Sequence, residues 1–308
     1  MSSRPIEQSA NPPQPAVGGA GRDAEAAARR AQVTIREVEA VTGLLEVAEL
    51  FSRIWDAPVV APMPHDLMRS LAHAGGRVHA AFRGGQLAGA AVAIFGPPAD
   101  GSCYSLIAGV LPGAGGQGIG LALKLAQRAW ALEAGASRMT WTFDPLLRRN
   151  ARFNLSRLGA VVCEYLVDFY GEIADGVNDP ETDRLAVTWD LRAPVPGSGR
   201  RSGRPGAPDP AGGDEARAIL DTGPGGEPVL IPRPATGAGG DPGSGGTGRL
   251  RCWIPEDIMA VRRASPGLAR RWRLAVRGAL AGAMGEGYRV TGVVEPGWYV
   301  MEKARAGR

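Results

Sequence analysis

The sequence predicts an α/β protein in which strands and helices alternate along the chain. Apolar runs of strand length are separated by segments whose apolar residues recur at the i, i+3, i+4 spacing of a helix. In addition, an apolar run that ends at Val110 passes through a glycine-rich loop directly into a helical pattern that begins near Ile119. The order strand, glycine loop, helix is typical of sheets that have helices packed on them.

The elements expected before this loop are two helices and a hairpin. Helical spacing over 39–55 predicts an amphipathic helix, and a second, short helix is expected over 66–73. Apolar runs over 78–82 and 87–95 are separated by the turn sequence Arg-Gly-Gly-Gln, so they predict a β-hairpin.

After the loop, the pattern predicts further alternation of helix and strand. A helix over 119–133 precedes a strand over 139–143, where large apolar residues alternate with threonine. A helix over 150–158 is expected to stop at Gly159, and two more strands are expected over 161–170 and 185–191.

Two segments have the composition of disordered chain. Residues 1–31 are rich in Pro, Gly, Ala and Ser with almost no apolar pattern, which predicts a disordered tail. Residues 193–248 are dominated by Pro, Gly, Ser and Arg and predict a long linker, with room for one short strand. They delimit a main domain at 32–192 and a helix–hairpin extension at 249–308, which we expect to pack on the main domain because it is small.

Composition narrows the class of protein. The chain has 308 residues and a formal net charge of +4, too small an excess to indicate nucleic-acid binding. Its three cysteines include no Cys-x-x-Cys pair, which argues against a disulfide framework or a metal site. No apolar run reaches the roughly 18 residues that a membrane span needs, and the N-terminus lacks the apolar core of a secretory signal. We therefore expect a cytoplasmic protein with no membrane partner.

The glycine loop has the features of a diphosphate-binding site. Backbone N–H groups at the start of a helix converge on one point, and the helix dipole favours negative charge there. Glycine lets phosphates approach because it has no Cβ. A tight turn without a ligand is one alternative. A dinucleotide-binding loop over 113–118 is another, but it needs an acidic residue at the end of the next strand, and Glu133 lies in a predicted helix.

Two motifs resemble those of the GNAT superfamily of acyl-CoA-dependent N-acyltransferases. The family's loop pattern, Arg/Gln-x-x-Gly-x-Gly/Ala, falls on 115–120, where Gly118 and Gly120 match and Gly115 replaces the usual long polar side chain. The second family pattern, which starts with Asn and ends in Leu-Gly-Phe/Ala, resembles 150–160. The resemblance implies a mixed, mostly antiparallel central sheet flanked by helices, with a small C-terminal helix–hairpin extension.

The resemblance also implies acyl-CoA as co-substrate, with acetyl-CoA expected first, and no metal. Backbone groups near the end of the strand before the loop would bind the pantetheine amides as an added strand does. The residues that the family patterns imply for CoA binding are Gly109, Val110, Gly115, Gly116, Gln117, Gly118, Ile119, Gly120, Asn150 and Arg152. Arg148 and Arg149 could also reach a CoA phosphate, with a solvated helix face as the alternative.

The family mechanism is direct attack of an amine on the thioester, with a base for the amine proton and an acid for the leaving thiolate. In many members the acid is a tyrosine three residues before the Leu-Gly pair, and that residue is Leu155 here. Asp144, at the end of the predicted strand 139–143, is the candidate base or ammonium ligand, and Tyr170 is a candidate acid. A turn aspartate and a half-buried strand tyrosine are the alternatives.

Together these features predict an N-acyltransferase that moves an acetyl or another acyl group, succinyl included, to a primary amine of a small molecule such as an amino acid. A non-catalytic acyl-CoA-binding or sensing module is the alternative, because Leu155 and Gly115 depart from the family pattern. A homodimer is left open.

A basic helix face is formed by Arg270, Arg271, Arg273 and Arg277. A solvated face explains it as well as nucleic acid does, so we expect no nucleic-acid partner.

Overall fold

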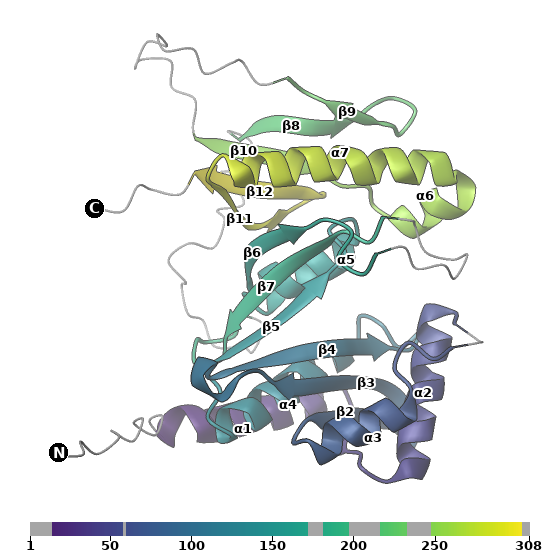
Figure 1. The fold of residues 1–308 in the computed structure, drawn as a ribbon, viewed down its shortest axis with the longest axis vertical. Helices are drawn as coiled ribbons and strands as arrows, with labels where there is room; N and C mark the ends of the chain where they lie inside the picture. The colour runs from purple at the N-terminus through teal and green to yellow at the C-terminus, as the bar shows by residue number, and fades with distance from the viewer. Residues whose placement is uncertain (1–13, 58–59, 172–180, 197–215, 233–247, 304–308) are drawn as a thin grey trace, which may run out of the picture. The chain divides into compact units, whose positions relative to one another are not determined.

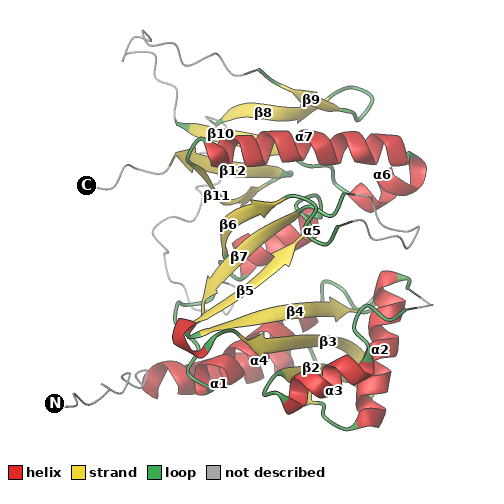
Figure 2. Cartoon of the chain, in the orientation of Figure 1, coloured by secondary structure: helices red, strands yellow, loops and turns green. Residues whose placement is uncertain are grey.

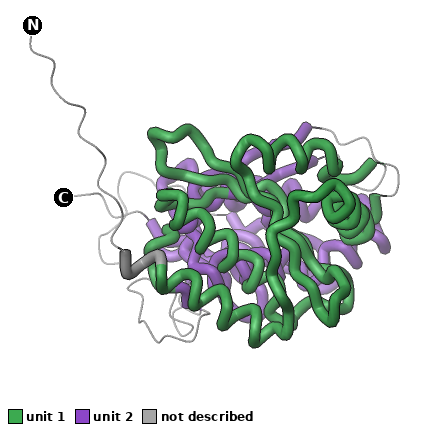
Figure 3. The backbone as a smooth tube through the Cα atoms, turned by 90° about the horizontal axis from the view of Figure 1, so that it is seen from below, with its two compact units in different colours: residues 1–140, 190–194 green, residues 141–189, 195–308 purple. Residues whose placement is uncertain are grey.

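The computed structural model describes residues 14–57, 60–171, 181–196, 216–232 and 248–303. The chain divides into two compact units (Figure 3). Unit 1 is Met1–Thr140 with Asp190–Pro194, and unit 2 is Trp141–Trp189 with Val195–Arg308. The boundary falls inside strand β5 (Arg138–Phe143), so this strand contributes to both units.

Unit 1 is a sheet with helices packed on it (Figures 1 and 2). Its strands lie in the order β1-β2-β3-β4-β5, and neighbours are antiparallel except β4 and β5, which are parallel. The elements are α1 (Gln14–Arg30), β1 (Thr34–Glu37), α2 (Val41–Trp55), α3 (His65–His73), β2 (Arg77–Arg83), β3 (Gln86–Phe95), the 3-10 turn η1 (Pro98–Asp100), β4 (Ser102–Val110) and α4 (Ile119–Glu133).

Helices cover both faces of the sheet in unit 1, as the side chains that alternate along strand β2 show. Val78 and Ala80 of β2 belong to one buried cluster with Leu44 and Phe51 of α2. The residue between them, His79, points the other way and meets the ring of Trp130 of α4 edge-on. Because successive side chains of a strand face opposite sides, α2 and α4 cover opposite faces.

The N-terminal segment differs from the disordered tail that the sequence predicts over 1–31. Residues Gln14–Arg30 form α1, which packs on α4. The contact uses small side chains, with Ala20 and Ala27 buried, and an ion pair of 3.3 Å between Asp23 and the buried Arg128 of α4. Alanine gives little apolar pattern in a sequence, yet it allows two helices to approach closely. Residues 1–13 lie outside the described part of the chain.

Unit 2 contains the rest of the first sheet and a second sheet. The first continues in the order β5-β7-β6, with β6 and β7 antiparallel, and the second has the order β11-β12-β10-β8-β9. The elements are α5 (Arg148–Ala151), the π-helical turn η2 (Arg152–Arg157), β6 (Val161–Leu166), β7 (Arg184–Asp190), β8 (Arg217–Thr222), β9 (Pro228–Leu230), β10 (Arg249–Trp253), α6 (Ile258–Ala264), α7 (Pro266–Gly285), β11 (Tyr288–Val294) and β12 (Trp298–Lys303).

The predicted fold class is confirmed: both sheets are mixed and mostly antiparallel, and helices pack on them. The predicted linker at 193–248 contributes two strands, β8 and β9, rather than one, and β8 pairs in parallel with β10. The C-terminal strand β11 contacts η2 and β6, and α7 also contacts β6. Within the described residues, no helix has the length and apolar character needed to cross a membrane.

Candidate functional site

The strand that leads into the glycine loop carries a β-bulge. Val92 of β3 pairs with Ile107 and Ala93 pairs with Ser105, so Leu106 is an extra residue on β4. Pairing of β4 with β5 covers Ser102–Tyr104, while β4 itself continues to Val110. A bulge increases the local twist and redirects a strand. The last residues of β4 are thus held by β3 and bent relative to its start.

Packing explains why Gly109 is a glycine. A Cβ at this position would lie 2.8 Å from the side chains of Ile54 and Trp55 in α2. One side of the strand at Gly109 is therefore closed by α2. Of Gly109 and Val110, which were predicted to bind pantetheine, Gly109 can contribute only its backbone groups.

The loop between β4 and α4 has the backbone geometry of an anion site. Gly113, Gly116 and Gly118 all have positive φ, between 81° and 87°. Gly118 is the N-cap of α4, and its carbonyl accepts the first helical bond, from Ala122 at 3.0 Å. In any helix the N–H groups of the first turn lack an acceptor within that helix. These groups and the helix dipole together favour an anion at this point.

Beneath the loop, α4 and β4 are joined by a buried polar trio that the sequence analysis did not single out. Lys124 donates to the Ser105 hydroxyl at 2.7 Å, and that hydroxyl donates to Gln127 Oε1 at 3.0 Å. Burial lowers the pKa of Lys124 to about 7, partly opposed by Cys103, whose own thiol pKa burial raises to about 12. The burial of Lys124 could have been inferred from the sequence, because this residue lies between the core residues Leu123 and Leu125.

In unit 2, the predicted base Asp144 forms a two-pronged ion pair with Arg273 of α7. The two N–O distances are 2.7 and 2.6 Å, and Asp144 also accepts from the Leu146 N–H at 2.8 Å. Burial alone would raise the pKa of Asp144, but the charge and hydrogen bonds of Arg273 outweigh burial and hold that pKa below its usual value. A carboxylate held in this way is a weak proton acceptor. Its bonds instead fix the end of β5 to α7.

A second acidic group, Asp183, was not found from the sequence. It accepts from the Tyr165 hydroxyl at 2.7 Å and from Arg277 at 2.9 and 2.7 Å, and Arg277 also reaches Asp168 at 3.0 Å. Burial, reinforced by Asp183, raises the pKa of Tyr165 far above its usual value. Asp183 lies next to β7 and far from Arg277 in sequence, so no local pattern joins them.

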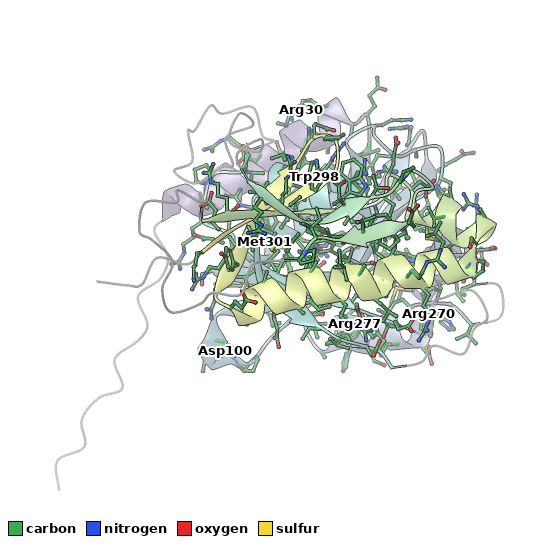
Figure 4. The ribbon with its side chains drawn as sticks, turned by 90° about the horizontal axis from the view of Figure 1, so that it is seen from above. Arg30, Asp100, Arg270, Arg277, Trp298 and Met301 are labelled. Carbon is green, nitrogen blue, oxygen red and sulfur yellow. The ribbon has the colours of Figure 1, made fainter. Side chains whose placement is uncertain are left out.

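The basic face of α7 therefore has acidic partners. Arg270 pairs with Glu181 at 2.7 Å, Arg273 with Asp144, and Arg277 with Asp183. Figure 4 shows Arg270 and Arg277 on the same side of α7, as their spacing of seven residues requires. These three arginines form ion pairs within unit 2.

Of the predicted CoA-binding residues of the 150–160 motif, Arg152 contacts the C-terminal hairpin. Arg152 contacts the Glu295 carboxylate and donates to the Pro296 carbonyl at 2.7 Å. Arg148 donates to the same carbonyl at 2.6 Å, and its guanidinium lies 4.8 Å from the centre of the Trp253 ring. Asn150 is exposed. The two arginine side chains thus tie α5 and η2 to the second sheet, a role that their proximity to the motif did not suggest.

The remaining candidates for proton transfer differ in exposure. Tyr170 is 51% exposed, its ring meets Phe169 edge-on, and the Arg184 guanidinium lies 4.9 Å from its ring centre. Leu155, at the usual tyrosine position, is buried and apolar. Next to it, Asn154 accepts a hydrogen bond from the Trp141 indole at 3.2 Å. Of these residues, only Tyr170 combines an ionisable side chain with an exposed position.

Comparison with known proteins gives structural likenesses only. No protein-family model matches the sequence, and no curated protein matches it. A GNAT-family acetyltransferase from Desulfovibrio desulfuricans is 18% identical with a TM-score of 0.41, covering 52% of this chain and 99% of that one. The ribosomal-protein-S18-alanine N-acetyltransferase from Escherichia coli is 16% identical with a TM-score of 0.43, covering 53% and 96%. An N-acetyltransferase from Staphylococcus aureus Mu50 is 14% identical with a TM-score of 0.43, covering 52% and 98%. Over about half its length, this chain is similar in structure to solved N-acetyltransferases, GNAT-family members among them.

Proposed function

We propose that the chain is an acyl-CoA-dependent N-acyltransferase that transfers an acetyl or another acyl group to a primary amine of a small molecule such as an amino acid. The observation that carries the proposal is the bulged strand β4 leading through the glycine loop to the Gly118 N-cap of α4. This arrangement offers strand-edge groups followed by converging N–H donors. Pantetheine amides followed by a diphosphate have the complementary order of groups.

In the proposed reaction, the amine attacks the thioester carbonyl carbon, the carbon–sulfur bond breaks, and the amine loses a proton while the thiolate gains one. Gly109 and Val110 hold the pantetheine through their backbone, and the loop holds the diphosphate. Asp144 keeps the end of β5 in place through Arg273 rather than accepting the amine proton itself, because its pKa is held low. Tyr170 is the candidate that protonates the thiolate, since it is an exposed tyrosine.

A non-catalytic acyl-CoA-binding module is the second candidate function. It is favoured by one observation: the usual acid position is the buried Leu155, and the predicted base, Asp144, is ion-paired with Arg273. Such a module would bind CoA esters without turning them over.

A two-stage experiment separates these candidates. Thermal shift with acetyl-CoA, succinyl-CoA, CoA and NADP first reports binding, since a ligand that binds only the folded state raises the Tm. Thiol release from the preferred acyl-CoA in the presence of single amino acids then reports transfer. Stabilisation by CoA esters with amine-dependent thiol release supports the enzyme. Stabilisation without release across a broad amine panel supports the binding module, and stabilisation by NADP alone contradicts both.

A further inference from the structure

We infer that Arg83 is a positioning residue for the glycine loop, which it holds in a diphosphate-binding shape by joining Gln117 to the C-terminus of α1. The inference rests on the proposed CoA binding and deepens it. Arg83 is the last residue of β2, outside both sequence motifs.

A continuous chain of hydrogen bonds crosses the loop. One guanidinium nitrogen of Arg83 donates to the Ala31 carbonyl at 2.9 Å, and the other donates to Gln117 Oε1. The amide nitrogen of Gln117 then donates to the Gly113 carbonyl at 3.2 Å. The loop is thereby closed on itself between Gly113 and Gln117 and fixed to two other elements of unit 1.

The anchor at Ala31 is itself well defined. Helix α1 ends in a Schellman motif: Gln32 has a φ of 54°, its N–H donates to the Arg29 carbonyl, and the Val33 N–H donates to the Ala28 carbonyl, both at 3.0 Å. The Ala31 carbonyl is one of the terminal carbonyls for which a helix offers no partner, and Arg83 supplies one. A cation is also favoured at this end of the helix dipole.

The same end of α1 lies close to Gly118 of the loop. A Cβ built at Gly118 would lie 3.5 Å from the Ala31 Cβ, which is ordinary van der Waals contact. Gly118 is the N-cap of α4, so the extra N-terminal helix borders the point where the phosphates are proposed to bind. Family members of the resembled type carry a long polar side chain at the loop's first position, which is Gly115 here. The Arg83–Gln117 pair provides polar bracing from outside that position.

The guanidinium group suits this role. It is planar and rigid, so it can donate to two acceptors at once in a fixed geometry, whereas a lysine ammonium is a single flexible point charge. A loop that is already fixed loses less conformational entropy when a ligand binds. Its positive charge also lies beside the loop, where it favours an anion.

The test measures the Kd of CoA and of pantetheine, which lacks the phosphates, for Arg83→Met, Arg83→Lys and Gln117→Ala. We expect CoA to bind roughly 10- to 100-fold more weakly to Arg83→Met, the range for loss of a hydrogen bond to a charged group. Pantetheine affinity should stay unchanged, because pantetheine has no phosphates for the loop to bind. A general loss of structure would instead weaken the binding of both ligands. Arg83→Lys should recover only part of the loss. Gln117→Ala, a change on the exposed loop, should show the same selective loss even if Arg83→Met folds poorly.

Arg36→Met is the matched control, because it removes the same charge from the neighbouring strand β1. Arg36 is exposed and its guanidinium lies over the Phe82 ring, 5.2 Å from the ring centre. The inference is overturned if Arg83→Met and Gln117→Ala leave CoA affinity unchanged, if pantetheine weakens equally, or if Arg36→Met gives the same loss. A wild-type protein that binds no CoA overturns the proposed function as well, which distinguishes the two failures.

Discussion

The glycine loop of unit 1 and the acidic cluster of unit 2 handle charge in opposite ways. The loop uses backbone N–H groups, and Gly116 and Gln117 are exposed to solvent. The cluster uses side chains, with Asp144 and Asp183 held by Arg273 and Arg277. The loop can therefore donate to an incoming anion, whereas the cluster has matched its charges internally. We propose a ligand-binding role for the first region and a stabilising role for the second.

Each region also contains a buried cation, and the two differ in their partners. Lys124 donates to the neutral hydroxyl of Ser105, and burial lowers its pKa to about 7. Arg273 faces the Asp144 carboxylate, which outweighs burial and raises the arginine pKa. The Asp144 carboxylate thus helps Arg273 to keep its charge, whereas burial makes Lys124 easier to neutralise.

The largest effect is expected from breaking the ion pair of unit 2. Arg273→Met leaves the Asp144 carboxylate buried without its cation, since the two side chains are only 2% and 13% exposed. Removing one partner of such a pair costs about 3–5 kcal/mol of unfolding free energy. Urea unfolding measures this change. Arg271→Met, on an exposed neighbouring residue of α7, should cost less than about 0.5 kcal/mol. Equal losses in the two variants would mean that the pair is not a stabilising feature.

The next effect concerns the loop. Gly118→Val should weaken CoA binding by about 100-fold or more, because a branched side chain at a φ of 87° distorts the N-cap where the phosphates are proposed to bind. Gly135→Val is a matched control: its φ is 89°, it lies just beyond the other end of α4, and a Cβ there would meet nothing within 4 Å. Both variants carry similar backbone strain. If Gly135→Val weakens CoA equally, the loss reflects strain in α4 rather than the loop.

The same contrast explains which features could be predicted from the sequence. The loop is contiguous, so strand, glycines and helix appear in order between Val110 and Ile119 and their chemistry follows from spacing. The pairs Asp144–Arg273 and Asp183–Arg277 join residues more than ninety positions apart, and pairing at that distance leaves no periodic signal. The bonds of Arg148 and Arg152 to the C-terminal hairpin were missed for the same reason. Helix α1 was missed because alanine and glycine give no apolar pattern, although its buried alanines pack well.

The third prediction tests the buried lysine of unit 1. With a folded pKa of about 7 and an unfolded pKa near 10.4, Lys124 holds more protons in the unfolded state between these values. The unfolding free energy should therefore rise with pH from about 7 to about 8.5, by about 1 kcal/mol per pH unit, and the cost of the buried charge should be fully present below pH 7. Above about pH 8.5 the rise should be opposed, because burial raises the thiol pKa of Cys103 and Cys252 and their unfolded forms lose protons first. Lys124→Met should flatten this rise. Lys303→Met, the same change at the chain's other lysine, which is exposed on β12, should leave the rise intact. A wild-type curve that is flat over this range would contradict the prediction.

The smallest effect on activity is expected from substitution of the candidate acid, Tyr170. This residue is exposed, whereas the ion-paired carboxylates Asp144 and Asp183 of unit 2 are largely buried. Tyr170→Phe removes the hydroxyl but keeps the ring contacts with Phe169 and Arg184. A thiolate leaves readily without a proton, so we expect kcat to fall by only about two- to tenfold, well below the 10²–10⁴ that general acid–base catalysis can contribute. The KM for acyl-CoA should not change, because a hydroxyl that acts only on the leaving thiolate does not contribute to binding of the ground state. Tyr288→Phe, at a half-buried tyrosine of β11 whose ring faces Lys303, is the control and should leave kcat unaltered. An unchanged kcat for Tyr170→Phe would exclude this hydroxyl as the acid and leave water as the proton donor. A thousandfold fall in kcat would contradict the expectation of a small effect. It would show that the exposed tyrosine, rather than the ion-paired Asp144, dominates proton transfer.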